Sequence, residues 1–432
     1  MDPTWTGIVG LLALFILLGM RMPVAIVMML IGFFGIAYLN SWDAALSTLA
    51  DEAWVISSNY EFIVIPLFIL MGNFASISGM SRDLYGAAYS WFGHWRGGLA
   101  SATIAACAGF AALSGSSVAS AVTMGRVALP EMKRYNYSDR LATGAIAAGG
   151  TLGILIPPSV ILVLYGVATQ TDIGKLFIAG IVPGILGILG YMAAVRVVCW
   201  RRPQAGPRGE RLGYRERLRA STGVAGILGL FVLVIGGIYL GVFTATEAAG
   251  IGATGALVIA LVRRRLSWRD LLETLSETAA TTTMMFMVLI GALIFSNFVN
   301  VAGMPGALED LVQASDLPPM AILGIVLLIY LALGMVLESL SMVLLTVPIL
   351  APLMAGLGFD LIWFGIVVVV VTEISLITPP VGLNVFVLKT VLPDVPIGTI
   401  FRGIVPFLIA DMFRLALIVL VPGVVLFLPS LM

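Results

Sequence analysis

Runs of about 20 apolar residues, the length a helix needs to cross a bilayer core of roughly 30 Å, follow one another along the whole chain. This feature limits the possible folds more than any other. Hydrophobic residues make up 60% of the 432 positions and charged residues only 11%, too few to cover the surface of a soluble domain. The sequence also lacks the alternating strands of about ten residues that build outer-membrane barrels. The fold is therefore predicted to be an all-α polytopic membrane protein.

Hydropathy predicts a series of helical segments along the chain. Their expected bounds are 4–20, 23–40, 60–79, 97–130, 139–168, 176–200, 222–241, 245–262, 280–302, 318–354, 361–390 and 402–429. The stretches 41–59 and 267–280 mix charged and apolar residues at helical spacing, so they are expected to be helices lying in the membrane interface, with ordinary loops as the alternative. The arginine-rich segment 201–221 is predicted to be a cytoplasmic linker, because basic loops stay on that side.

A pair of adjacent prolines interrupts each of two apolar segments. Pro157–Pro158 lies within 139–168, and Pro379–Pro380 lies within 361–390. Each proline removes a backbone donor and clashes with the preceding turn, which costs a helix about 3 kcal/mol or more. Both segments are therefore predicted to be discontinuous helices. Kinks that serve no ligand are the alternative.

Two further segments, 97–130 and 318–354, are too long for a single crossing. Each has small or polar residues near its middle, at Leu113–Ser120 and at Gly334–Ser341. We interpret both as re-entrant hairpins whose tips lie at membrane depth. Two full crossings would leave the basic loops on the same sides, so that alternative stays open.

The two halves of the chain repeat these features in the same order. Pro157 and Pro379 are 222 residues apart (379 − 157), and Pro130 and Pro352 and also Asp172 and Asp394 share this offset, while Asn73 and Asn297 differ by 224. Counting five crossings and one hairpin in each half, the second repeat is predicted to be inverted relative to the first, as in many secondary transporters. Both aspartates are expected to be helix N-caps.

The predicted division of the chain follows from this repeat. It consists of a first repeat at 1–200 (scaffold helices 1–79, hairpin 97–130, broken helix 139–168, helix 176–200), the linker at 201–221, and a second repeat at 222–432 (scaffold helices 222–302, hairpin 318–354, broken helix 361–390, helix 402–429).

Broken helices and hairpin tips together predict a binding site. Freed carbonyl groups suit an alkali cation, and amides at half-helix N-termini suit an anion. The first cation site is predicted from Ser114, Gly115, Ser116, Gly150, Gly153 and Pro157, and the second from Gly334, Glu338, Ser339, Thr372, Thr378 and Pro379. The substrate-binding residues are predicted to be Ser116, Ser117, Pro158, Ser159, Glu338, Ser339, Pro380 and Asn384. Plain helix packing is the alternative for the small residues. For Glu338, a structural or cation-linked role is favoured over direct contact with the substrate. Glu373, also at membrane depth, is a further ionisable candidate near the second site.

Four long motifs carry a resemblance to a known family. They are SGSSVASAVTMGRVALPEMKR, GILIPPS, LESLSMVLLTVPILAP and TPPVGLNVFVLK. In these motifs the sequence resembles the large membrane (M) subunit of tripartite ATP-independent periplasmic (TRAP) transporters, and the likeness covers essentially the whole chain. The resemblance implies an elevator in the bacterial inner membrane that is driven by sodium ions and has no other cofactor.

The same resemblance implies partners and a cargo. The expected partners are a small four-helix membrane subunit on a separate chain and a periplasmic substrate-binding protein, and the expected cargo is an organic acid such as a dicarboxylate, keto acid or sialic acid. A self-sufficient cation- or proton-coupled symporter is the alternative. A net charge of zero gives no reason to expect a nucleic-acid partner. The sequence holds no HExxH or GxGD motif and no histidine cluster, so no catalytic residues are predicted.

Overall fold

The structure is a computed structural model that describes residues 2–432, and every element in that range is helical. The first half contains α1 (Pro3–Gly19), α2 (Val24–Leu39), α3 (Trp42–Ser58), η1 (Tyr60–Ile63), α4 (Val64–Ile77), α5 (Met80–Phe92), α6 (Gly98–Ser114), α7 (Ser117–Arg134), α8 (Asp139–Thr151), η2 (Leu152–Ile154), α9 (Val160–Thr169) and α10 (Ile173–Arg201). The second half contains η3 (Pro203–Ala205), α11 (Tyr214–Tyr239), α12 (Ala245–Val262), α13 (Trp268–Val301), α14 (Met304–Ala314), α15 (Pro319–Gly334), α16 (Ser339–Gly356), α17 (Leu361–Ile377), α18 (Leu383–Val391), α19 (Ile397–Leu420), α20 (Gly423–Leu426) and η4 (Pro429–Leu431).

Length and composition agree with the predicted class. Within residues 2–432, seven helical segments are long and apolar enough to cross a membrane, and several shorter apolar helices accompany them. The protein is thus an all-helical polytopic membrane protein, as predicted.

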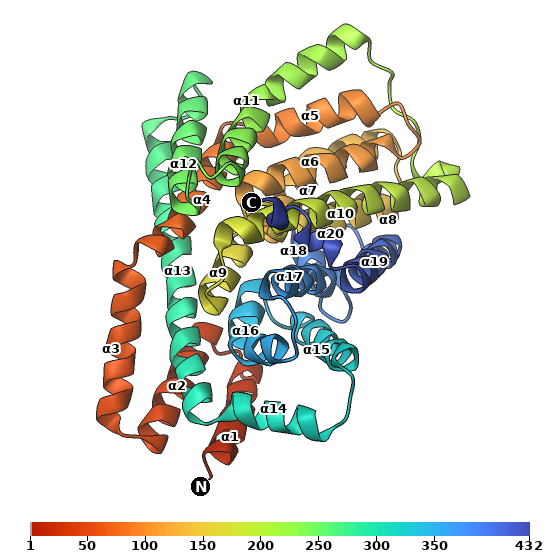
Figure 1. Cartoon of the computed structure of the whole chain (residues 1–432). Coiled ribbons are helices and arrows are strands. Elements are labelled where there is room, and N and C mark those ends of the chain that lie inside the picture. Colours follow the sequence, from red (N-terminus) through yellow and green to blue (C-terminus); the bar gives the residue numbers. More distant parts are fainter. Residues whose placement is uncertain (1) are drawn as a thin grey trace.

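An outer group of helices is built around α13. This long helix runs down one side of the molecule in contact with α2, α3 and α4, while α12 packs on α4 and α11 on α5 (Figure 1). The apolar side chains that point away from these contacts are exposed, for example Leu228 and Met284. Exposed apolar residues on long helices are expected where lipid is the solvent.

An inner group contains the four motifs singled out in the sequence. Helices α6 and α7 form one helical pair and α15 and α16 another, and α9, α16 and α17 lie side by side (Figure 1). Every residue of α17 from Trp363 to Ile377 is buried. Because no side chain in this stretch is exposed on any face of the helix, α17 lies at the centre of this group.

Helix starts in the two halves recur at a nearly constant offset. The matched starts are Ser117 and Ser339, Asp139 and Leu361, Val160 and Leu383, and Ile173 and Ile397. The first two pairs differ by 222 (339 − 117; 361 − 139), the third by 223 and the fourth by 224. The matched helices also pack crosswise, α7 on α18 and α9 on α16. Both observations support an internal repeat.

The prediction of an interfacial helix at 267–280 separate from a span at 280–302 was wrong, because α13 is continuous from Trp268 to Val301. No glycine or proline interrupts its first five turns, and the hydroxyls of Thr274 and Thr278 donate to carbonyls one turn earlier. These bonds satisfy the polar side chains inside the helix. The polar stretch therefore lengthens the helix instead of ending it.

Three smaller predictions also need correction. Helix α11 begins at Tyr214, inside the predicted linker 201–221, because Glu216 accepts a bond from the Gly213 amide and closes its first turn. The last predicted span, 402–429, ends at Leu420, just before a proline. Asp172 caps α10 as predicted, but the N-cap of α19 is Pro396 and not Asp394.

The helices α5 and α14 were not predicted. They are short amphipathic helices that precede the two helical pairs, and each begins after a glycine with a positive φ, Gly79 and Gly303.

Candidate functional site

The tip between α6 and α7 is a tight turn made by Gly115 and Ser116. Gly115 has a φ of 58°, a left-handed conformation that favours glycine. Ser116 is the N-cap of α7, and its hydroxyl accepts a bond from the amide of Ala119 at 3.3 Å. The hydroxyl of Ser114 instead faces Ser120 at 3.1 Å. The turn therefore presents backbone groups and the start of α7, with Ser114 directed into the pair itself.

The first break separates α8 from α9 at Pro157 and Pro158. In an unbroken helix the amide of residue 158 would serve the carbonyl of Ile154, but proline has no N–H. The Ser159 hydroxyl replaces it, donating to that carbonyl at 2.5 Å, and Ser159 is also the N-cap of α9. The carbonyl of Gly153 loses its helical partner in the same way, because residue 157 is proline. This carbonyl is the best candidate in the first half for a cation ligand.

The first tip and the first break meet backbone to backbone. A Cβ atom built on Gly153 would lie 2.8 Å from the carbonyl oxygen of Ser116, and one built on Gly115 would lie 3.3 Å from the carbonyl oxygen of Pro158. Gly150 similarly allows α8 to lie against Ala121 of α7. The structure therefore brings together most of the residues predicted for the first cation site.

The second tip packs on α17 through another glycine. A Cβ atom on Gly334 would lie 2.0 Å from the hydroxyl oxygen of Ser375, which itself donates to the carbonyl of Thr372 at 2.7 Å. Thr378 ends α17 and donates to the carbonyl of Ile374. Gly334 therefore packs on the last turns of α17, between Thr372 and Thr378 in the sequence.

The two breaks differ in their access to the surroundings. Pro157, Pro158 and Ser159 are buried, whereas Pro379 and Pro380 are exposed. Glu338, the N-cap residue of α16, is also exposed, and its side chain makes no hydrogen bond to the described residues. Ser339 behind it is buried. The proline pair of the first break is thus buried, whereas that of the second break is exposed.

A contact between the halves joins the predicted substrate-binding residues. The Ser117 hydroxyl at the start of α7 donates to Asn384 Oδ1 at 3.4 Å, and the side-chain amide of Asn384 donates to the carbonyl of Ala147 on α8 at 3.5 Å. Asn384 belongs to the first turn of α18 and is fully buried. A Cβ atom on Gly115 would lie 3.5 Å from the amide nitrogen of Val160, the first residue of α9. The N-terminal ends of α7, α9 and α18 thus converge.

A buried ionic cluster next to the breaks was missed by the sequence analysis. Arg414 on α19 pairs with Glu373 on α17 at 2.5 Å and with Asp411 at 2.8 Å, and Tyr191 on α10 donates to Asp411 at 2.6 Å. The Tyr191 hydroxyl lies 3.2 Å from that of Thr151, at the end of α8. Glu373 is therefore committed to an ion pair. An aspartate and an arginine three residues apart in an apolar span were the signal that could have revealed the cluster.

Side-chain carboxylates do not form a metal site among residues 2–432. In the part that the structure describes, no group of three or more His, Cys, Asp or Glu side chains could hold a metal ion. The two cysteines, Cys107 and Cys199, are free and buried. A cation at the breaks would depend on carbonyl and hydroxyl oxygens, the ligand types preferred by hard cations.

Comparison with known proteins identifies the family. Residues 11–424 match the family described as Tripartite ATP-independent periplasmic transporter, DctM component. The chain belongs to this TRAP family. It is 38% identical over 387 residues to the C4-dicarboxylate TRAP transporter large permease protein DctM of Pseudomonas aeruginosa, covering 89% of this chain and 90% of that protein. It is 34% identical over 375 residues to the sialic acid TRAP transporter large permease protein SiaM of Vibrio cholerae, covering 86% and 87%.

A solved structure supports the fold of this TRAP subunit. The crystal structure of the YdaH transporter of Alcanivorax borkumensis superposes with a TM-score of 0.62 over 88% of each chain, at 15% sequence identity. The protein is therefore a multi-pass membrane transporter subunit, the large TRAP permease, and not an enzyme.

Proposed function

We propose that this TRAP permease carries out sodium-coupled uptake of an organic acid anion by an elevator mechanism. The observation that carries the proposal is the meeting of the first tip with the first break, where the N-terminal ends of α7, α9 and α18 converge on Ser117 and Asn384. Helix N-termini carry unpaired amides and a partial positive charge, so a carboxylate is the ligand that they favour.

Sodium coupling is supported by the chemistry of the two breaks. Each proline pair leaves helix carbonyls without their usual donors, next to a hairpin tip that approaches through glycine. The Ser159 hydroxyl and the Thr378 amide each bond to one of these carbonyls. The remaining carbonyls need a partner at membrane depth, which a cation would supply. Cations at Gly153 and at Thr378 would offset the charge of the anion and hold the tips against the breaks.

The relatives support the proposed class of substrate. The names of the two relatives specify a C4-dicarboxylate and sialic acid, and both compounds carry a carboxylate. Pro380 in the second break is exposed, and we infer that the substrate approaches the converging helix ends from this side. We infer that a periplasmic binding protein delivers the anion and that a small membrane subunit, on a separate chain, completes the transporter.

The elevator proposal is supported by the division into an outer and an inner group of helices. In this proposal the inner group, with both tips and both breaks, moves against the outer group around α13. The repeat, inverted as proposed, would give the inner group two equivalent end positions. Spin labels at Met284 on α13 and at Val336 in the second tip, both exposed, test the movement. The expected result is two distances whose populations change with sodium and substrate, and one fixed distance would rule the movement out.

Uptake into proteoliposomes tests the function itself. The large permease is reconstituted with its small subunit, and labelled C4-dicarboxylate is supplied with the binding protein. Uptake is expected with an inward sodium gradient and to stop when sodium is equal on both sides, even with a proton gradient imposed. Uptake driven by protons alone would disprove sodium coupling, and uptake without the binding protein would support a self-sufficient symporter.

A further inference from the structure

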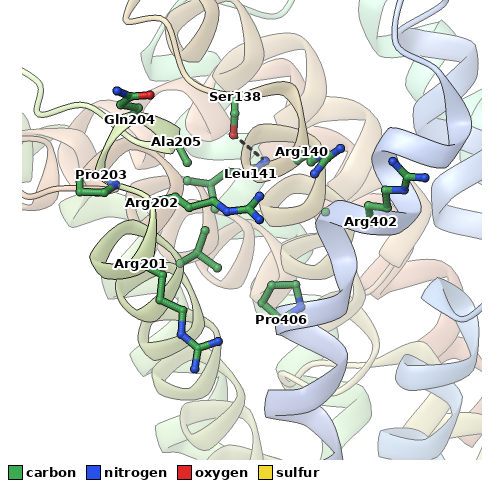
Figure 2. A pocket seen from close by; sticks show the side chains of 12 residues that line it. Ser138, Arg140, Leu141, Arg201, Arg202, Pro203, Gln204, Ala205, Arg402 and Pro406 are labelled. Carbon is green, nitrogen blue, oxygen red and sulfur yellow. Dashed lines mark hydrogen bonds between the residues drawn. The ribbon is translucent and has the colours of Figure 1, made fainter.

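An arginine-lined cavity lies where α8, α10 and α19 meet, apart from the residues assigned to transport. Its volume is about 930 Å³, and its lining includes Arg140, Arg201, Arg202 and Arg402. Figure 2 shows Arg140 at the start of α8, Arg202 at the end of α10 and Arg402 at the start of α19, with the Arg201 side chain directed away from these three. The described lining residues include no Asp or Glu. The cavity is therefore strongly positive.

The charge of these arginines is not balanced by ion pairs among the described residues. None of the four forms an ion pair with a carboxylate in residues 2–432. Asp139, next to Arg140 in the sequence, is exposed and does not line the cavity. All four arginines are exposed, so solvent screens their mutual repulsion, and together they form a positive surface that attracts anions. The charge pattern calls for an anionic ligand.

Backbone bonds hold the frame of the cavity in place. The amide of Ser138 donates to the carbonyl of Ala205 at 3.0 Å, and the amide of Gly97 donates to the carbonyl of Gly206 at 2.9 Å. A Cβ atom on Gly403 would lie 2.0 Å from the carbonyl oxygen of Arg140, so α8 and α19 are in direct backbone contact here. The loop after α10 and the two helices are thus fixed relative to one another. The four arginines project from a preformed frame.

The cavity also has an apolar part that continues along α19. Leu141, Val198 and Pro406 belong to its lining. One turn beyond, Ile409 is 53% exposed, and Trp200 near the end of α10 is 79% exposed. Tryptophan beside arginine is typical of the membrane–water interface. This arrangement suits a ligand with a charged head and apolar chains better than a fully soluble anion.

We propose that the cavity binds the phosphate head group of an anionic phospholipid, with the acyl chains lying along α19. Arginine pairs with phosphate oxygens through two parallel hydrogen bonds, and basic pockets between membrane helices bind anionic lipid head groups. The arginine-rich segment that contributes Arg201 and Arg202 is the one predicted to be cytoplasmic, where anionic lipids concentrate. The lipid would join α8, which carries the first break, to α10 and α19.

Binding is tested with the purified full-length protein in nanodiscs. Thermal unfolding midpoints and lipid adducts in native mass spectra are compared for phosphatidylglycerol and phosphatidylcholine, and in detergent for inorganic phosphate. The test variant combines Arg202→Gln with Arg402→Gln. The matched control is Arg219→Gln, an exposed arginine on α11 that does not line the cavity.

The wild-type protein and the control are expected to retain phosphatidylglycerol and to unfold at a higher temperature with it. The double variant is expected to bind it about 30-fold more weakly, from the usual contribution of two basic residues beside anionic lipid. If it does not fold, Arg402→Lys, which keeps the charge but loses the paired hydrogen bonds, should still bind more weakly than the control. Equal binding by the control and these variants would overturn the proposal. Stabilisation by inorganic phosphate as strong as that by the lipid would overturn the lipid as the occupant.

Discussion

Replacing Gly153 with alanine tests the contact between the first tip and the first break. The added Cβ would lie 2.8 Å from the Ser116 carbonyl oxygen, whereas ordinary contacts begin at 3.4 Å, so the tip must retreat by about 0.6 Å (3.4 − 2.8). The Ser116 oxygen belongs to the backbone and the backbone also fixes the position of the alanine Cβ, so no side-chain rotation can relieve this contact. Inserting a methyl group into a packed site costs about 1–3 kcal/mol, which corresponds to a loss of about 5- to 150-fold in affinity.

The assay measures how uptake depends on the sodium concentration, because the proposed cation ligands include the carbonyl of Gly153 and the Gly115–Ser116 turn. The sodium concentration for half-maximal uptake is expected to rise about 5- to 150-fold in Gly153→Ala, with the protein still eluting as a single species. The matched control is Gly324→Ala on α15, where an added Cβ meets nothing within 4 Å. If the two variants have the same sodium dependence, the first break is not a cation site.

Three further predictions concern other parts of the protein. Gly334→Ala should impair uptake because its Cβ would lie 2.0 Å from the Ser375 hydroxyl oxygen, and adding Ser375→Gly should restore part of it; no rescue would contradict the proposed packing. Arg414→Met leaves two buried carboxylates unpaired, so it should cost about 3–5 kcal/mol and lower the thermal unfolding midpoint, whereas Arg269→Ala in an exposed pair should change it little; equal effects would contradict the buried role. Burial, with repulsion from nearby arginines, lowers the pKa of His94 in the folded protein from its ordinary value of 6.5. The unfolded chain therefore binds the proton more readily, so stability should fall as the pH drops through 6.5, the pKa of the unfolded chain. The fall should be smaller in His94→Gln, and identical pH profiles in thermal unfolding would refute this.

The sequence predicted the positions of the tips and breaks because their causes are local. Proline removes a donor wherever it stands, and a glycine between two apolar runs permits a turn that other residues resist. Pro157 and Gly115 therefore mark their structures without help from the rest of the fold. The constant offset between halves added a second, independent line of inference.

The remaining features depend on tertiary packing. Nothing near Arg414 in the sequence indicates that Glu373, on another helix, is its partner, and Glu373 alone suggested a free ligand. The boundary at 280 was wrong for a related reason, since the threonine hydroxyls of α13 bond to their own helix. Hydropathy does not register such bonds. The approach of Asn384 to Ser117 also required the three-dimensional arrangement of the two halves.

The most direct test of the account is an experimental density map of the complex, recorded once in sodium and once with choline in its place. Sodium-dependent density is expected between the Gly115–Ser116 turn and Gly153, with a second peak at Thr378 beside the other tip. Unchanged density at both breaks, or an ion bound elsewhere in the inner group, would contradict it.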